Sequence, residues 1–166
     1  MRVREARSIY LRNFVFGVED SLVSTVGLLS GLSASGVPRH TIVITGIVLL
    51  SVEALSMGVG SLLSEHSVEE FRKHGEVPQT QAIIGGFIMF ASYVLSGFIP
   101  LAPYAATFIP YPFWFSIIIT LLSLIFLGII SAKASRTSVG RHSIEMLLLG
   151  GIAIFVGVMV GQIVKL

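Results

Sequence analysis

The chain has 166 residues, of which 54% are hydrophobic, 12% are charged and none is cysteine, and its formal net charge is +2. A soluble domain carries about 25% charged residues, so this chain has too few charges to cover a water-facing surface, and most of its surface must face lipid. The lack of cysteine excludes disulfides and thiolate metal sites, so any metal ion must be bound by oxygen, imidazole or thioether ligands.

Five apolar segments are each long enough to cross a bilayer, which requires roughly 20 residues in a helix. The chain is therefore predicted to be all-α: a polytopic membrane protein with a single transmembrane domain, residues 1–166, built as a five-helix bundle. Prolines between the third and fourth segments predict a chain reversal there, because proline interrupts a helix. The predicted helices span residues 13–35, 41–64, 81–104, 112–133 and 143–164, and residues 65–80 form a short cytoplasmic connector.

Lysine and arginine are distributed unequally between the two ends of the predicted helices. One end has only Arg39 and Lys165. Because loops rich in positive charge stay in the cytoplasm, the N-terminus is predicted to be cytoplasmic and the C-terminus outside the cell or lumenal, in a cell membrane or a vacuole-like organelle membrane. Beyond these orienting charges no basic stripe is left for nucleic acid. The nine residues at the other end are Arg2, Arg4, Arg7, Arg12, Arg72, Lys73, Lys133, Arg136 and Arg141.

Three acidic side chains lie inside the predicted helices, where a charged group is costly. Glu19 and Asp20 lie about a third of the way along the first helix, and Glu53 lies near the middle of the second. No basic residue lies at a similar depth, so these carboxylates are expected to be protonated, exposed to water or bound to a cation. Function is the default interpretation of acids at such positions.

Helical geometry places Asp20 and Glu53 on stripes of small or polar residues, with Met57 one turn after Glu53. If the two stripes face each other, these three residues share a polar seam and are predicted to be metal ligands. Carboxylates alone would suit Mg²⁺ or Ca²⁺, whereas the thioether favours Fe²⁺, Co²⁺ or Zn²⁺. Taken alone, Met57 would be interpreted as a packing residue. The candidate residues along the ion path are Glu19, Asn13 and Ser24.

The predicted connector is expected to extend the second helix by a turn or two into the cytoplasm, and it contains side chains that are able to collect metal ions. His66 and Glu70 are four residues apart and would share one face if the segment is helical. The simpler interpretation, which we favour, is a solvated charged connector. The candidate cytoplasmic metal-collecting residues are Glu65, His66, Glu69 and Glu70.

Glycines in the first and last helices are spaced so that helix backbones can approach closely. Gly157 and Gly161 form a GxxxG pattern, and Gly27 and Gly31 have the same spacing. We predict that all four are helix-packing positions. Glu145 is expected in the first turn of the last helix, where a favourable interaction with the helix dipole explains it.

Three motifs, in chain order, resemble the vacuolar iron transporter family. Residues 12–25 (RNFVFGVEDSLVST) resemble the FGxxDGxxS pattern of its first helix, residues 56–58 (SMG) its second-helix signature, and residues 96–104 (SGFIPLAPY) its GxxIPLxPY segment. The resemblance covers nearly the whole chain. It implies a homodimer with the ion path on its two-fold axis, and export of Fe²⁺, with Mn²⁺ as a further cargo, from the cytosol in exchange for protons. It also implies that Asp20 and Met57 contact the ion.

The chain departs from the family pattern at several positions. Asn13 stands where relatives can carry a second aspartate, and Ser21 replaces the usual glycine after Asp20. Glu53 stands where a small residue is expected, and could replace the missing carboxylate at another depth. The short interval of residues 65–80 leaves no room for the glutamate-rich cytoplasmic domain of the best-known family members.

The predicted function is therefore proton-coupled export of a divalent transition-metal ion, with no resident cofactor. Its expected partners are the lipid bilayer, the metal ion and a second copy of the chain, but no nucleic acid. The alternative is a non-transporting scaffold or assembly subunit, whose glycines only pair helices. We do not expect an enzyme, because no nucleophile–base set is present and the four histidines lie in loops or at helix ends: His40, His66, His74 and His142.

Overall fold

The computed structural model describes residues 2–75 and 77–165, with side chains described from Ala6 onward. Within these residues the chain is entirely helical apart from short connections. All five helices are long and apolar enough to cross a membrane, which confirms the predicted five-helix transmembrane architecture. The helices are α1 (Arg2–Ala34), α2 (Arg39–Lys73), α3 (Thr80–Ala105), α4 (Pro112–Ser135) and α5 (Val139–Lys165).

The second helix extends into the predicted connector by somewhat more than the turn or two that was expected. α2 continues through residues 65–73, which were expected in the connector, and ends where His74 adopts a left-handed conformation with φ of 53°. Glutamate, arginine and lysine are good helix formers, so the polar composition that suggested a connector also allows the helix to continue into water. The N-terminal arginines likewise belong to α1, which begins at Arg2 rather than near residue 13.

The third helix continues past two prolines. Pro100 and Pro103 lie inside α3 and are buried, and the chain reverses only after Ala105. A proline cannot donate a backbone hydrogen bond, so carbonyls in the preceding turn lose their helical partners. Here those are the carbonyls of residues 96 and 99. Side chains from other helices donate to the carbonyls of the prolines themselves: Ser116 Oγ donates to that of Pro100 at 2.7 Å, and Arg39 donates to that of Pro103 at 2.9 Å.

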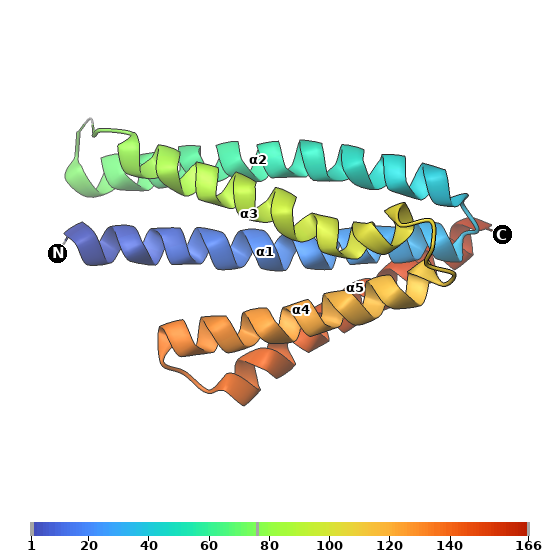
Figure 1. Cartoon of the computed structure of the whole chain (residues 1–166). Coiled ribbons are helices and arrows are strands. Elements are labelled where there is room, and N and C mark those ends of the chain that lie inside the picture. The colour runs from blue at the N-terminus through green and yellow to red at the C-terminus, as the bar shows by residue number, and fades with distance from the viewer. Residues whose placement is uncertain (1, 76, 166) are drawn as a thin grey trace.

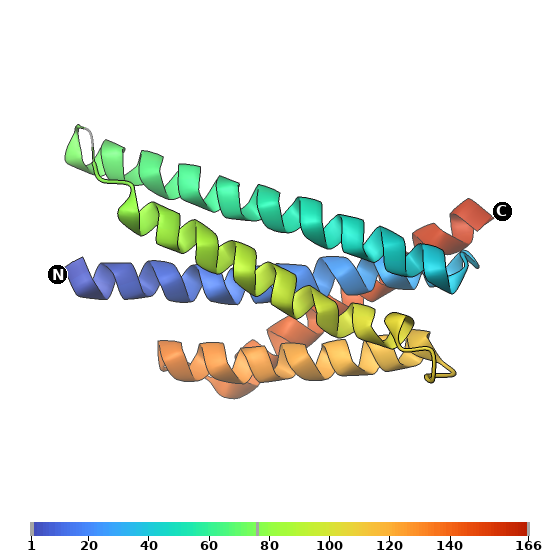
Figure 2. The ribbon, with the colours of Figure 1, turned by 45° about the horizontal axis from the view of Figure 1, so that its top comes forward.

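α1 is the central element of the bundle and contacts all four other helices. In Figures 1 and 2, α2 lies on one side of α1 and α4 on the other, α3 and α5 run obliquely across α1, and the two termini lie at opposite ends. Within the described residues α2 packs only against α1 and α3. We use "N-terminal end" for the end of the bundle where α1, α3 and α5 begin, and "C-terminal end" for the other.

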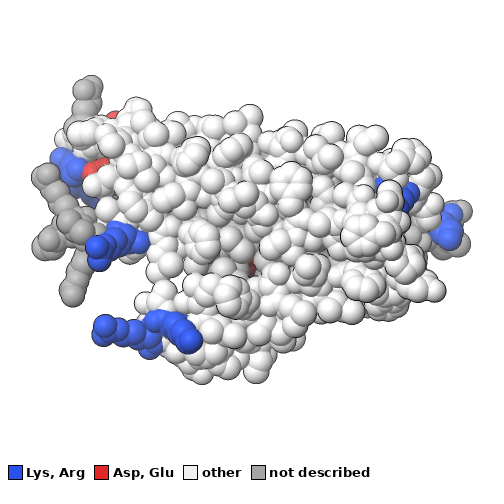
Figure 3. Space-filling model, viewed as in Figure 1, with Lys and Arg blue, Asp and Glu red and all other residues white. Residues whose placement is uncertain are grey.

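Two hydrophobic clusters fill the spaces on either side of α1. The first joins α1, α2 and α3, and the second joins α1 to α4 and α5 through Leu22, Leu124, Leu127 and Met146. Many large apolar side chains point outward, as expected for a surface that faces lipid. On the face drawn in Figure 3, lysine and arginine gather at the two ends of the molecule.

The predicted packing glycines face one another across α1 and α5. A Cβ added at Gly31 would lie 2.7 Å from the carbonyl oxygen of Gly157. Cβ atoms at Gly157 and Gly161 would overlap the carbonyls of Gly27 and Gly31. Lipid offers no hydrophobic driving force for helix association, so this backbone-to-backbone contact is a main source of attraction between the two helices.

Candidate functional site

A carboxylate near the middle of α2 is hydrogen-bonded by two other helices. Oε2 of Glu53 accepts hydrogen bonds from the hydroxyl of Tyr93 on α3 and, at 3.3 Å, from Oγ of Ser24 on α1. The hydroxyl oxygens of Ser24 and Tyr93 are 2.8 Å apart. One carboxylate oxygen therefore lies where α1, α2 and α3 meet, within the membrane-crossing part of each helix.

Close packing of α3 places Tyr93 beside Glu53. Ser21 Oγ donates a hydrogen bond to the carbonyl of Tyr93 at 2.7 Å. One turn later, Gly97 lies so close to α1 that a Cβ there would be 2.6 Å from Ser21 Oγ. Tyr93 is fully buried. The sequence analysis missed it, although a tyrosine in the middle of an apolar helix was an available signal, because tyrosine is enriched at membrane interfaces.

Asp20 lies one turn before Ser24 on α1 and faces a different space. With Ser24 it lines a groove of about 700 Å³ between α1 and α5, whose other lining residues are mostly small or apolar. The carboxylates of Asp20 and Glu53 are close enough to repel each other when both are ionised, and Asp20 and Glu19 are as well. No ion pair among the described residues involves any of the three. Their negative charge is thus not compensated by a basic side chain, which favours a bound cation or bound protons.

Met57 and Glu19 line a second space, a cavity of about 990 Å³. It extends from the N-terminal end, where Arg12 lines it, to Met57 in the middle of α2, and it also includes Asn13. Six serines are also among its lining residues: Ser8, Ser56, Ser61, Ser64, Ser131 and Ser135. Their hydroxyl groups can hold water or a hydrated ion.

The structure separates the predicted ligands: Asp20 lines the groove, Met57 lines the cavity, and Glu53 lies at the junction of α1, α2 and α3. The two small-residue stripes do not face each other. Gly17 of α1 packs against α3, where its Cβ would be 3.0 Å from the carbonyl oxygen of Met89, whereas a Cβ added at Gly60 of α2 meets nothing within 4 Å. Glu53 still reaches α1 through Ser24. In the part of the chain that is described, no three His, Cys, Asp or Glu side chains are close enough to bind one metal ion.

The acids expected in the connector form separate contacts on the last turns of α2. Glu65 accepts hydrogen bonds from Arg12 and Asn13 of α1. Glu70 pairs with His66 at 3.2 Å, and Glu69 pairs with Lys73. These four side chains, Glu65, His66, Glu69 and Glu70, therefore do not converge on one point.

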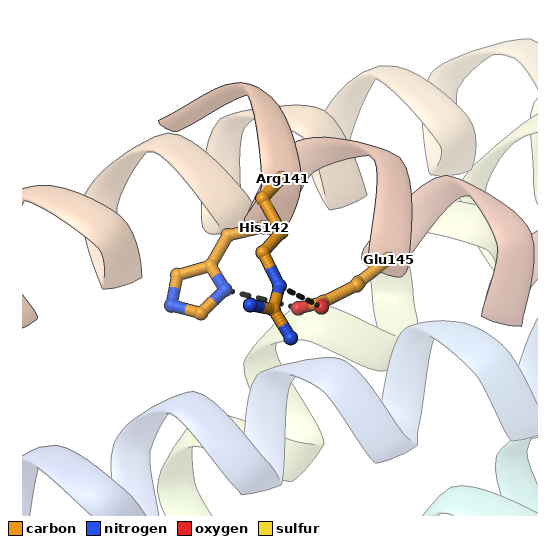
Figure 4. Close-up of polar contacts among 3 residues, drawn as sticks. All are labelled: Arg141, His142 and Glu145. Carbon is orange, nitrogen blue, oxygen red and sulfur yellow. Dashed lines mark hydrogen bonds and ion pairs between the residues drawn. The ribbon is translucent and has the colours of Figure 1, made fainter. Parts of the chain in front are cut away.

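Glu145 lies beyond the first turn of its helix, contrary to expectation, because α5 begins at Val139. Its partners are the Arg141 Nε, 2.8 Å from Oε1, and the His142 Nδ1, 3.0 Å from Oε2 (Figure 4). Local pairing on the surface of α5, rather than the helix dipole, accounts for this residue.

Five membrane-crossing helices with uncompensated acids among them define an integral membrane protein of the ion-transport class. Residues 11–83 and 70–162 match the model of the VIT family. The chain belongs to the VIT family, and it is accordingly a metal-ion transporter rather than an enzyme.

Several plant proteins are similar to most of the chain. Vacuolar iron transporter 1 of Tulipa gesneriana is 24% identical over 86% of this chain and 82% of its own length. Its Arabidopsis thaliana counterpart is 23% identical over 86% and 81%. Vacuolar iron transporter homolog 4 of Arabidopsis thaliana is 28% identical over 89% and 80%. The first two alignments, over 205 residues, are longer than this chain, so those transporters contain residues with no counterpart here.

Proposed function

We propose that the chain exports a divalent transition-metal ion, Fe²⁺ with Mn²⁺ as a second cargo, from the cytosol in exchange for protons. The observation that carries the proposal is the Glu53 carboxylate, held by Ser24 and Tyr93 in mid-membrane beside a second carboxylate, Asp20. Two acids that repel each other in hydrocarbon need either a cation or protons, and alternation between the two is the exchange that a coupled transporter requires.

The proposed ion ligands are Asp20, Glu53 and Met57. Carboxylate oxygens attract any divalent cation, and a thioether sulfur adds preference for the softer transition metals. The Met57 side chain is partly buried and lines the serine-rich cavity. In this proposal that cavity conducts a hydrated ion from the N-terminal end towards Met57, past Asn13 and Glu19, while Ser24 stays beside Glu53.

A second copy of the chain is proposed to complete the ligand set, as the resemblance to the family implies. The α2 surface offers a place for it. Ser56, Gly60 and Ser64 are exposed at spacings of four residues, and the space beside Gly60 is open. Small residues at this spacing allow close approach of two helices. Symmetry would then place two Met57 side chains and two sets of acids around one axis.

The unequal charge of the two ends supports the proposed orientation in the membrane. Seven arginines and lysines with described side chains lie at the N-terminal end, whereas only Arg39 and Lys165 lie at the other. The positive-inside rule places the N-terminal end in the cytoplasm, and export towards the C-terminal end follows from the resemblance. The plant relatives named vacuolar iron transporters suggest iron as the cargo.

The test is metal flux by purified protein in liposomes that contain a metal-sensitive dye and a pH-sensitive dye. Wild type should move Fe²⁺ or Mn²⁺ and protons in opposite directions. Asp20→Asn should abolish both signals without changing the elution volume in detergent, and Glu145→Gln, which lies on the surface of α5, should leave both unchanged. Flux through Asp20→Asn would show that the site assignment is wrong, and a folded wild type without flux would favour the scaffold alternative.

A further inference from the structure

The contact between Glu65 and α1 joins a buried anion to an exposed cation. The Glu65 side chain is only 7% exposed, whereas that of Arg12 is 66% exposed. Oε1 of Glu65 accepts hydrogen bonds from Arg12 Nη2 at 2.6 Å and from Asn13 Nδ2 at 2.8 Å. The Arg12 guanidinium is already largely in water, but its departure alone would leave the carboxylate as a buried, unpaired anion, which is costly unless another cation takes its place.

The second oxygen of this carboxylate is unused. Oε2 of Glu65 is buried and has no hydrogen-bond partner among the described residues, and the same is true of the hydroxyl of Ser61, one turn earlier on α2. Gly85 of α3 closes the space so tightly that a Cβ there would lie 2.9 Å from Oε2. A buried carboxylate oxygen without a partner is rare and needs an explanation. Oxygen atoms of this kind are the ligands that divalent cations prefer.

The contact also lies between two cavities. Glu65 lines a cavity of about 670 Å³ at the N-terminal end, and Asn13 lines the 990 Å³ cavity that leads to Met57. Arg12 lines both cavities. The carboxylate of Glu65 and the guanidinium of Arg12 therefore lie where the two cavities adjoin.

We propose that Glu65, with Ser61 and Asn13, forms a mouth site for the incoming divalent cation, and that Arg12 occupies this site as a built-in competitor until the cation displaces it. The inference rests on the proposed transport function and adds a regulated first binding step to it. Displacement exchanges a monovalent guanidinium, which moves into water, for a divalent cation, so the carboxylate keeps a counter-ion throughout and the site gains one positive charge. The all-oxygen mouth site selects divalent charge, and selection for softer metals is left to the deeper site with Met57.

If Arg12 competes with the cation for Glu65, the two single variants should change Mn²⁺ affinity in opposite directions. Arg12→Gln removes the competing cation and should lower the Mn²⁺ concentration that half-saturates binding by about threefold, the scale of a partly exposed ion pair. Glu65→Gln should raise it. In the double variant the Arg12 substitution should have no further effect, because the carboxylate for which it competes is absent.

Equilibrium binding of Mn²⁺ to the purified protein, followed by the paramagnetic resonance signal of free Mn²⁺, measures these shifts without transport. If Arg12→Gln weakens binding as Glu65→Gln does, the pair is only a structural salt bridge and the proposal is overturned. Because Glu65 is buried, Glu65→Asp, which keeps the charge, is the second variant if Glu65→Gln fails to fold. Adding Arg12→Gln to Glu65→Asp must then lower the half-saturating Mn²⁺ concentration by the same factor as in wild type. Wild type that binds Mn²⁺ with these signs but shows no flux would contradict the transport function and leave the mouth site intact.

Discussion

At each end of the bundle one arginine joins two helices, and the two arginines have different partners. At the N-terminal end Arg12 pairs with the carboxylate of Glu65. At the C-terminal end Arg39, the first residue of α2, donates only to backbone carbonyls at the end of α3 and in the following loop: those of Pro103, Tyr104, Ala106 and Ile109. One guanidinium thus donates to four carbonyls at the end of a helix and in the turn after it, one of which, that of Ala106, also accepts from the backbone N–H of Ile109.

The difference between the two arginines determines which end can respond to an ion. A carboxylate can exchange its counter-ion or take up a proton, whereas a peptide carbonyl stays neutral and keeps its donor. The C-terminal end is further fixed by the glycine contact between α1 and α5. The bundle therefore has a fixed C-terminal end and an N-terminal end whose buried carboxylate is able to exchange its counter-ion. Substitutions at each end can test this difference separately.

The largest effect is expected from breaking the glycine contact at the fixed end. Gly157→Leu places a side chain on the carbonyl of Gly27, and because the obstacle is backbone, α5 must move. Overpacking of this kind should cost about 3 kcal/mol of unfolding free energy. Gly151→Leu on the same helix is the matched control, since a Cβ there meets nothing within 4 Å. Thermal unfolding in detergent measures both, and equal stability would show that α5 does not cross α1 at these glycines.

A smaller loss is expected when the arginine of the fixed end is removed. Arg39→Ala leaves the carbonyls at the end of α3 without their donor, which should cost about 2 kcal/mol of unfolding free energy, because water at this end replaces only part of the lost hydrogen bonding. Arg39→Lys should recover part of the loss, since an ammonium has fewer donors and no planar fork. Lys165→Ala at the same end is the control. If Arg39→Ala unfolds like Lys165→Ala, the two ends are not held differently.

The five-helix architecture could be predicted from the sequence because apolar length alone defines a membrane helix. Helix neighbours could not be predicted in the same way. The glycines of α1 have the same spacing whether they face α2, α3 or α5, and only the folded chain assigns Gly17 to α3 and Gly31 to α5. The expected seam of α1 against α2 was therefore only partly realised, through the hydrogen bond between Ser24 and Glu53.

The candidate site shows the same limit of sequence reasoning. Buried acids stand out in an apolar sequence, so Asp20 and Glu53 were found. Their hydrogen-bond partners in distant segments do not stand out. Tyr93 lies forty residues from Glu53 along the chain. Glu65 appeared to be one of several charges in a connector, and only the packing of α2 against α1 shows that it is buried.

Between the two ends, Tyr93→Phe tests whether Glu53 depends on its hydrogen bond. The phenol donates to the carboxylate oxygen and holds it where α1, α2 and α3 meet, so its loss should weaken metal binding by Glu53. The loss of one such bond is worth about 1 kcal/mol, which is roughly a fivefold rise in the half-saturating metal concentration. Tyr111→Phe, at an exposed tyrosine, is the matched control. Flux measured over a range of metal concentrations would contradict the role of Tyr93 if both variants behave alike.

The smallest effect is expected from breaking a second ion pair at the N-terminal end. This pair lies at the same end of the bundle as Arg12 and Glu65, so a comparison of the two pairs isolates the effect of burial. Arg141 and Glu145 resemble Arg12 and Glu65 in residue type and differ in burial, since their side chains are 78% and 45% exposed. Water already solvates both partners and salt screens them, so Arg141→Ala should change neither the unfolding midpoint nor Mn²⁺ binding measurably. Binding titrations of this variant beside Arg12→Gln would separate the loss of any positive charge at this end from the loss of one that covers a buried carboxylate. An equal shift in both variants would mean that general electrostatic attraction, rather than competition at Glu65, governs cation binding at the N-terminal end.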